Sequence, residues 1–165
     1  MPGSGPLAVI WDRLSASSWH VAEEAAAKHG WTLLSLEIND PVDIEPAFKA
    51  AVEARADGLL VTASAHLFAR AKSVADLAAK SRLPTVYQLR AYVDAGGLMS
   101  YAPSLIETWR RAATYVDKIL KGERAADLPV EQPTRFEFVI NLNAARALNL
   151  TVSPSLLVQA TDVIE

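Results

Sequence analysis

Five short apolar runs, separated by stretches of helical periodicity, constrain the fold of this chain more than any other feature. The runs are Leu7–Trp11, Thr32–Ile38, Gly58–Val61, Leu83–Tyr87 and Leu98–Tyr101. Short runs that are continuously apolar are typical of strands buried on both faces of a parallel sheet. The pattern therefore predicts an α/β fold built on a doubly wound, parallel five-stranded sheet with the strand order 2-1-3-4-5.

The stretches between these runs carry apolar residues at helical spacing. They are Trp19–His29, Asp43–Ala56, Leu67–Ser81 and, after the fifth run, Leu105–Leu120. In the last of them, five apolar residues share one stripe: Ile106, Trp109, Ala113, Val116 and Leu120. An apolar stripe on a helix normally packs into a core, so this stripe is expected to complete an α/β lobe spanning residues 7–121.

The chain changes character after this lobe. Residues 122–134 are charged, contain two prolines and have no apolar face, so they are predicted to be a crossover linker. Residues 135–165 then form a strand-helix extension, in which Arg135–Ile140 alternates apolar and polar side chains. Such alternation is typical of a half-exposed strand, and we expect this extension to pack on something other than the parallel sheet.

Composition excludes several classes of function. The chain of 165 residues is 51% apolar and 21% charged, as expected for a globular domain, and it has a net charge of −3 without a basic run. Binding to nucleic acid would need a basic patch. There is no cysteine, and the amino-terminal stretch and the remaining sequence lack the pattern of a signal peptide or a membrane span. The sequence as written is thus expected to be cytoplasmic.

Four loops should meet where the strands end. In open parallel sheets, ligands bind beyond the carboxyl ends of the strands, near helix amino termini. The loops are residues 12–18, 62–66, 87–90 and 101–104. They carry hydroxyl groups, aromatic rings and one cation, Arg90, which together suit a small anionic or aromatic ligand. The serines could equally be ordinary helix caps.

Catalytic and cofactor motifs are not found. The sequence has no GxxxxGK[ST] loop, no GxSxG elbow and no HExxH pair, so neither an enzyme activity nor a cofactor is predicted. Ser64 and His66 could form a nucleophile pair, but no third group that would orient them is evident. An enzyme on this scaffold is therefore the weaker alternative.

Long stretches of the chain resemble one protein family. The segments GGLMSYAPS, RRAATYVDKILKGERAADLPVEQPTRFEFVINLNAARALNL and SPSLLVQATDVIE are similar to the carboxyl-terminal region of ABC-transporter substrate-binding proteins of the tryptophan/tyrosine type. The segments AVIWD and RADGLLVTASAHLFARAKSVADLAAKSRLPTVY are similar to the second lobe of these proteins. The resemblance implies a type I periplasmic-binding-protein fold, in which two α/β lobes close on a ligand and deliver it to a membrane permease.

The resemblance also implies a ligand site. The ligand-facing residues of the lobe would be Ser17, Ser18, Ser64, Tyr87, Arg90 and Tyr101, and the ligand would be a small amino-acid-like or aromatic molecule. The stretch VYQLRAYV differs from the Pro-Ser and acidic residue that are more frequent in the family. No metal or other cofactor is implied.

The resemblance covers only the second lobe and the carboxyl-terminal return segment. In the family the last strand and helix would return to the first lobe, which this sequence lacks, so we expect residues 135–165 to pack on a second copy instead. The leading prediction is a truncated solute-binding component of an ABC transporter, with an ABC permease as partner if a first lobe is supplied. The alternative is a cytoplasmic ligand-sensing or structural homodimer without a transport role.

Overall fold

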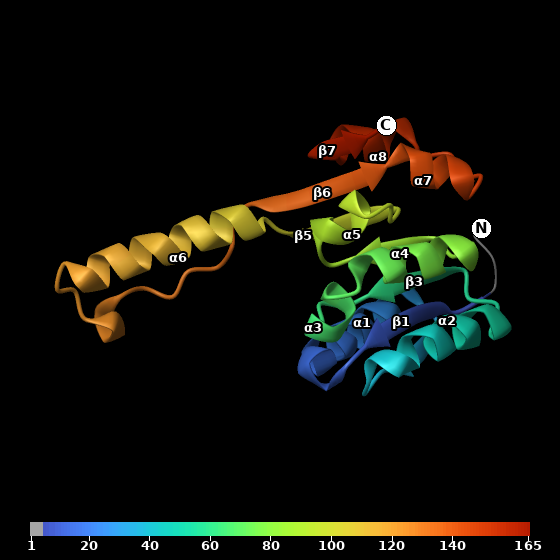
Figure 1. Cartoon of the computed structure of the whole chain (residues 1–165), viewed down its shortest axis with the longest axis horizontal. Coiled ribbons are helices and arrows are strands. Elements are labelled where there is room, and N and C mark those ends of the chain that lie inside the picture. The colour runs from blue at the N-terminus through green and yellow to red at the C-terminus, as the bar shows by residue number, and fades with distance from the viewer. Residues whose placement is uncertain (1–4) are drawn as a thin grey trace.

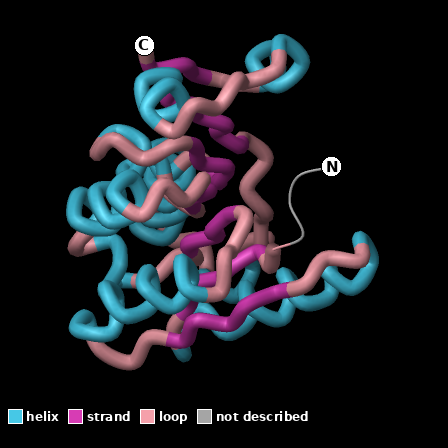
Figure 2. Tube along the Cα trace, turned by 90° about the vertical axis from the view of Figure 1, so that its right-hand side faces the viewer, coloured by secondary structure: helices cyan, strands magenta, loops and turns pink. Residues whose placement is uncertain are grey.

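The seven strands in the described part of the chain all lie in one sheet. The computed structural model describes residues 5–165; residues 1–4, part of the amino-terminal stretch considered above, lie outside the described residues. The strands are β1 (Leu7–Trp11), β2 (Leu33–Glu37), β3 (Gly58–Val61), β4 (Thr85–Tyr87), β5 (Met99–Pro103), β6 (Phe136–Asn141) and β7 (Asp162–Ile164). Their order is β2-β1-β3-β4-β5-β6-β7, and Figure 2 shows them following one another through the molecule.

Eight α-helices accompany the sheet in the described part of the chain. They are α1 (Ala16–His29), α2 (Ile44–Glu53), α3 (Ala65–Phe68), α4 (Ala71–Lys80), α5 (Arg90–Asp94), α6 (Leu105–Leu120), α7 (Leu142–Ala147) and α8 (Pro154–Gln159). The predicted helix over residues 67–81 is therefore two helices. The backbone leaves the helical region at Arg70, with φ −121° and ψ 26°, and this residue separates α3 from α4.

The parallel part of the sheet confirms the predicted fold. Strands β1 to β5 are all parallel, in the order expected from the five apolar runs. The consecutive residues Ala8, Val9 and Ile10 of β1 are all fully buried. Because neighbouring side chains of a strand point to opposite faces, both faces of the sheet are covered here, which explains why the run is apolar throughout.

The carboxyl-terminal extension lies differently from the prediction. Strand β6 pairs antiparallel with β5 on one side and parallel with β7 on the other. Residues 135–165 therefore extend the lobe's own sheet from five strands to seven, and they are not a separate segment that packs elsewhere. Val139 and Ile140 are fully buried in this position, so the sheet itself buries these two apolar residues of the extension.

Helix α6 does not pack on the sheet. It projects from the body of the molecule, and the following chain returns beside it to the start of β6 (Figure 1). The stripe that was expected in the core is exposed, with Trp109 at 73% and Leu120 at 82% of their accessible surface. The reason is the direction of β6: an antiparallel neighbour can be reached by a hairpin, and no crossover helix over the sheet face is required.

Candidate functional site

The carboxyl ends of β1 and β3 hold a cluster of buried polar side chains. Asp12, Ser15, Thr62 and Ser64 are each exposed by 5% or less. Asp12 directly follows β1, and Thr62 directly follows β3. Since β1 and β3 are parallel neighbours, their ends meet at the same edge of the sheet, where ligands bind in open α/β folds. We refer to these four residues as the edge cluster.

Hydrogen bonds connect three residues of the edge cluster, Asp12, Ser15 and Thr62. Oδ1 of Asp12 accepts from the backbone N–H of Ser15 and from its hydroxyl, both at 2.9 Å. The hydroxyl of Thr62 lies 2.9 Å from Oγ of Ser15 and 3.1 Å from the carbonyl oxygen of Ile10. These contacts tie the loop after β1 to the loop after β3 and hold both in one arrangement.

Asp12 is the charged group of this cluster. Burial by itself would raise its pKa, but the neighbouring hydroxyls of Ser64 and Ser15 and the backbone of the loop lower the pKa by more, so the carboxylate is favoured. Among the described residues, Oδ2 of Asp12 has no partner with normal hydrogen-bond geometry. The sheet edge thus carries a buried negative charge with spare acceptor capacity. The sequence interpretation included Asp12 only as part of a loop and did not name it as a site residue. Its position directly after a buried strand could have identified it.

Ser64 caps the short helix α3. Its side chain accepts from the backbone N–H of Leu67 at 3.4 Å, so the capping alternative considered for this serine is realised. The neighbouring N–H of Ala63 donates to Oε1 of Gln88 at 2.7 Å, which links the loop after β3 to the loop after β4. Gln88 was not among the predicted residues. Three of the four predicted loops are therefore joined at this edge.

The remaining predicted residues lie in four different settings, of which the first two are at the surface. Ser17 is exposed and Ser18 half-buried in the first turn of α1, next to the edge cluster in sequence. Tyr101 of β5 is 58% exposed and stacks on Phe136 with ring centroids 5.5 Å apart. Its ring therefore contributes to the surface near the start of α6, on the antiparallel side of the sheet.

Tyr87 is placed in the core instead of on a ligand-accessible surface. Its side chain is fully buried and its ring stacks on that of Tyr92, with centroids 4.8 Å apart. Burial raises the pKa of both phenols. The odd residues of a strand share a face, and Thr85 and Tyr87 both point inward while Val86 is exposed, which explains this orientation.

Arg90 is engaged within the chain. Its guanidinium lies 2.6 Å from Asp162 and 3.3 Å from Asp94, and the hydrogen bond to Asp162 is the main cause of its raised pKa. It therefore joins the loop after β4 to the last strand of the sheet. A ligand carboxylate would have to compete with these two carboxylates for it.

An aromatic pair includes the residue that directly precedes Asp12 of the edge cluster. Trp11, the last residue of β1, stacks on Trp19 of α1 with centroids 5.6 Å apart. The indole N–H of Trp11 donates to Oγ of Ser35 at 2.8 Å, which orients the ring. Within residues 5–165, no group of three metal-ligating side chains is assembled, and no helix is long and apolar enough to cross a membrane.

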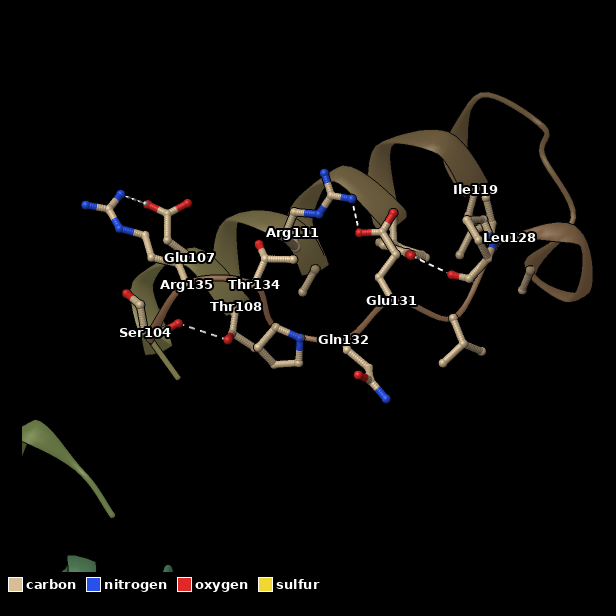
Figure 3. A pocket seen from close by; sticks show the side chains of 16 residues that line it. Ser104, Glu107, Thr108, Arg111, Ile119, Leu128, Glu131, Gln132, Thr134 and Arg135 are labelled. Carbon is tan, nitrogen blue, oxygen red and sulfur yellow. Dashed lines mark hydrogen bonds and ion pairs between the residues drawn. The ribbon is translucent and has the colours of Figure 1, made fainter. Parts of the chain in front are cut away.

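A cavity in the described part of the chain lies away from this edge. It has a volume of about 720 Å³ and separates α6 from the returning chain of residues 125–135 (Figure 3). Two contacts close it: the hydroxyl of Tyr115 donates to the carbonyl of Pro129 at 2.5 Å, and Arg111 pairs with Glu131. The side chains of Arg111, Tyr115 and Glu131 are therefore engaged within the hairpin.

Comparison with known proteins agrees with this architecture. Three solved structures share the fold, and all are less than 25% identical to this chain. A conserved domain protein from Vibrio cholerae has a TM-score of 0.90 and 23% identity, over 99% of this chain and 56% of its own. A protein from Streptococcus pneumoniae in complex with L-Trp has a TM-score of 0.86 and 23% identity, over 97% and 55%. An open, ligand-free substrate-binding protein with adhesive properties from Clostridium difficile has a TM-score of 0.71 and 17% identity, over 99% and 56%.

This chain therefore spans a little more than half the length of these structures. No match was found among curated proteins. Residues 12–164, which include nearly all of the described chain, match the family of ABC transporter substrate-binding proteins. The match covers the edge cluster and both strands of the carboxyl-terminal extension, and the chain belongs to this family.

Proposed function

We propose that this chain is the ligand-binding lobe of an ABC transporter substrate-binding protein and that it binds a small amino-acid-like molecule at the edge cluster. The observation that carries the proposal is the convergence of four buried polar side chains, Asp12, Ser15, Thr62 and Ser64, at the carboxyl ends of β1 and β3. Hydrogen bonds join the first three of them. Four buried polar residues at one sheet edge are costly unless they are used together, and this edge is where such folds bind ligands.

The chemistry of the edge supports an amino-acid-like ligand. A buried carboxylate attracts an ammonium group, the hydroxyls of the neighbouring loops can donate to a carboxylate, and the stacked rings of Trp11 and Trp19 offer an apolar face for a side chain. The structure from Streptococcus pneumoniae, which is in complex with L-Trp, supports the same ligand class. The role proposed is binding and transfer, without catalysis.

Delivery to a permease is part of the same proposal. The related structures are nearly twice as long as this chain, so closure around the ligand would need a second lobe, supplied by the same polypeptide or by another. In this scheme the lobe described here supplies one wall of the ligand site. The completed pair of lobes would then present the ligand to an ABC permease.

Thermal stability in the presence of free amino acids tests the proposal. A ligand that binds only the folded state stabilises it by RT ln(1 + [L]/Kd), about 2.7 kcal/mol at 100 times Kd. For a chain of this length, that corresponds to an increase in Tm of roughly 5–10 °C. The panel should include aromatic, aliphatic and charged amino acids, and we expect one class to raise Tm.

Two serine caps provide a matched pair of variants. Ser64→Ala removes the cap of α3 inside the edge cluster, whereas Ser153→Ala removes the equivalent cap of α8, where the side chain accepts from Leu156 N–H at 3.3 Å. Each should cost about 1 kcal/mol of stability. Only Ser64→Ala should weaken the response to the ligand. A chain that shows no shift with any ligand, or equal responses in both variants, would contradict binding at this edge and would favour the structural alternative.

A further inference from the structure

Helices α4 and α7 leave a pocket between them on one face of the sheet. The pocket has a volume of about 120 Å³ and lies over the amino ends of β4 and β5. Exposed residues, Ala79, Gly96 and Ala147, form its mouth, and buried residues, among them Thr85 and Tyr87, form its inner part. The pocket is therefore a recess that leads from the surface toward the core.

This pocket is separate from the edge cluster. Thr85 is the first residue of β4 and Leu98 directly precedes β5, whereas the edge cluster lies at the carboxyl ends of β1 and β3. Because these four strands are parallel, the two places lie at opposite ends of the sheet. Helix α6 begins after the carboxyl end of β5 and projects away from α4 and α7 (Figure 1). Binding in the pocket therefore does not depend on the function proposed above.

Small side chains give the pocket its space. Five alanines and two glycines line it, and Ala75, Ala78 and Ala79 lie at the spacing of one face of α4. Protein interiors are close-packed, with few voids larger than a water molecule. A cavity needs only about 10–15 Å³ to hold one water molecule, so the space left here is several times larger. These small residues thus line a recess instead of bringing the two helices into contact.

Tyr87 brings an unpaired hydroxyl group to the pocket. Its side chain is fully buried, and among the described residues its hydroxyl oxygen has no hydrogen-bond partner of normal geometry. A Cβ added at Gly97 would lie 2.6 Å from Cε2 of Tyr87 and 3.1 Å from Cζ, so the hydroxyl-bearing end of the ring lies against the turn that lines the pocket. A buried polar group of this kind destabilises the fold unless a partner satisfies it.

The polar groups of the pocket suit one neutral hydroxyl group. Burial raises the pKa of Tyr87, so the phenol keeps its proton at neutral pH and can donate it. The nearby side chain of Thr85 opposes part of this rise in the pKa of Tyr87, and it donates its own proton to the carbonyl oxygen of Leu83 at 2.9 Å. The oxygen of Thr85 can therefore only accept. A ligand hydroxyl can accept from Tyr87 and donate to Thr85, which satisfies both groups at once.

The rest of the lining disfavours ions and water. None of the described residues that line the pocket is charged, and all except Thr85 and Tyr87 have apolar side chains or none. An ion would lose its hydration there without gaining an opposite charge. A buried water molecule typically makes about three hydrogen bonds, more than the two hydroxyl groups supply. A small molecule with one hydroxyl group and an apolar remainder matches both parts of the lining.

We propose that this pocket binds a small neutral alcohol, whose hydroxyl group pairs with Tyr87 and Thr85 and whose apolar part lies against the alanines of α4 and α7. An apolar cavity of about 150 Å³ holds one benzene molecule, so the volume of the pocket suits a branched alcohol of about five non-hydrogen atoms. The bound molecule connects α4, β4 and α7, which lie far apart in the sequence.

Isobutanol is the probe, and isobutylamine and isobutyrate are its charged analogues of similar shape. Backbone amide chemical shifts of the full chain report binding, because Gly96, Gly97 and Leu98 all line the pocket. We expect isobutanol to shift these amides in a saturable way, with a Kd of about 1 mM. The two ions should leave them unchanged at pH 7. An absence of saturable shifts with isobutanol, or equal shifts with either ion, would overturn the proposal.

Two pairs of variants locate the bound alcohol. Tyr87→Phe keeps the ring and removes the hydroxyl group, so it should raise the Kd by about 10-fold, whereas Tyr101→Phe, at an exposed ring outside the pocket, should leave the Kd unchanged. Ala79→Leu fills the exposed mouth and should abolish the shifts, whereas Ala27→Leu, at an exposed position of α1, should not. Circular dichroism checks that each variant is folded. An unchanged Kd in Tyr87→Phe or in Ala79→Leu would show that the alcohol binds elsewhere and would refute the site.

Discussion

Removing one hydroxyl group from the core is expected to make this protein more stable. Tyr92 is fully buried in the helix α5, and among the described residues its hydroxyl oxygen has no hydrogen-bond partner. Its ring lies nearly parallel to that of Tyr87, with an interplanar angle of 8°. The ring therefore contributes packing, while the hydroxyl contributes only the cost of leaving water.

The expected change in the free energy of unfolding follows from these separate contributions of the ring and the hydroxyl. A buried polar group without a partner costs about 1–3 kcal/mol, and the Tyr92→Phe substitution removes that cost while keeping the stacked ring. Allowing for the small space left behind, we expect a gain of about 1 kcal/mol in the free energy of unfolding. For a chain of 165 residues, this corresponds to a rise of about 2–4 °C in Tm.

Urea unfolding gives the required comparison. The midpoint should rise for Tyr92→Phe at an unchanged m-value, measured at one fixed protein concentration so that any self-association contributes equally. Tyr101→Phe is the control, because the same atom is removed from a side chain that is 58% exposed, and its effect should stay within about 0.5 kcal/mol. A loss of 1 kcal/mol or more for Tyr92→Phe would refute the reasoning, since it would mean that the hydroxyl has a strong partner in the folded protein.

Two further substitutions test the core and the edge cluster. Gly97→Ala should destabilise the fold by about 1–3 kcal/mol. The reason is that the added Cβ would lie 2.6 Å from the ring of Tyr87 and 2.8 Å from the carbonyl oxygen of Tyr92. Chemical denaturation measures this loss, and an unchanged free energy of unfolding would show that the rings can shift. Asp12→Asn should lower stability at pH 7 and by less at pH 3. The pKa of Asp12 is lowered in the folded state, so the carboxylate's contribution is present above the unfolded pKa and is lost as pH falls through the folded pKa. A difference between variant and parent that stays constant from pH 7 to pH 3 would contradict this.

The local order of the sheet could be predicted from the sequence because it depends on short-range signals. Each apolar run had to be buried on both faces, and each was followed by a helical stretch, which for parallel strands leaves few possible topologies. Strands β1 to β5 confirm this prediction. The position of the edge cluster followed from the same argument, since the carboxyl ends of parallel strands meet on one side.

The contents of that edge could be predicted only in part. Ser64 was identified as a residue of the loop after β3, and it lies in the edge cluster. Tyr87 lies at the start of the loop predicted after the fourth strand. Alternate residues of a strand point to the same face, and this alternation directs the side chain of Tyr87 into the core. Which residue of a strand end points inward depends on register with the neighbouring strands, and a run of three residues does not determine it.

The sequence by itself determined the alternation of buried strands and amphipathic helices, the polar character of the loops at the carboxyl ends of the strands and the apolar stripe of α6. Only the tertiary structure decided where that stripe and the carboxyl-terminal extension lie. Antiparallel pairing of β6 with β5 adds the extension to the sheet and leaves α6 as a projecting hairpin. The physical reason is that an apolar stripe on a helix indicates only that this face of the helix is to be buried. The pairing of strands far apart in the sequence decides whether the described part of the chain supplies a surface that buries this face.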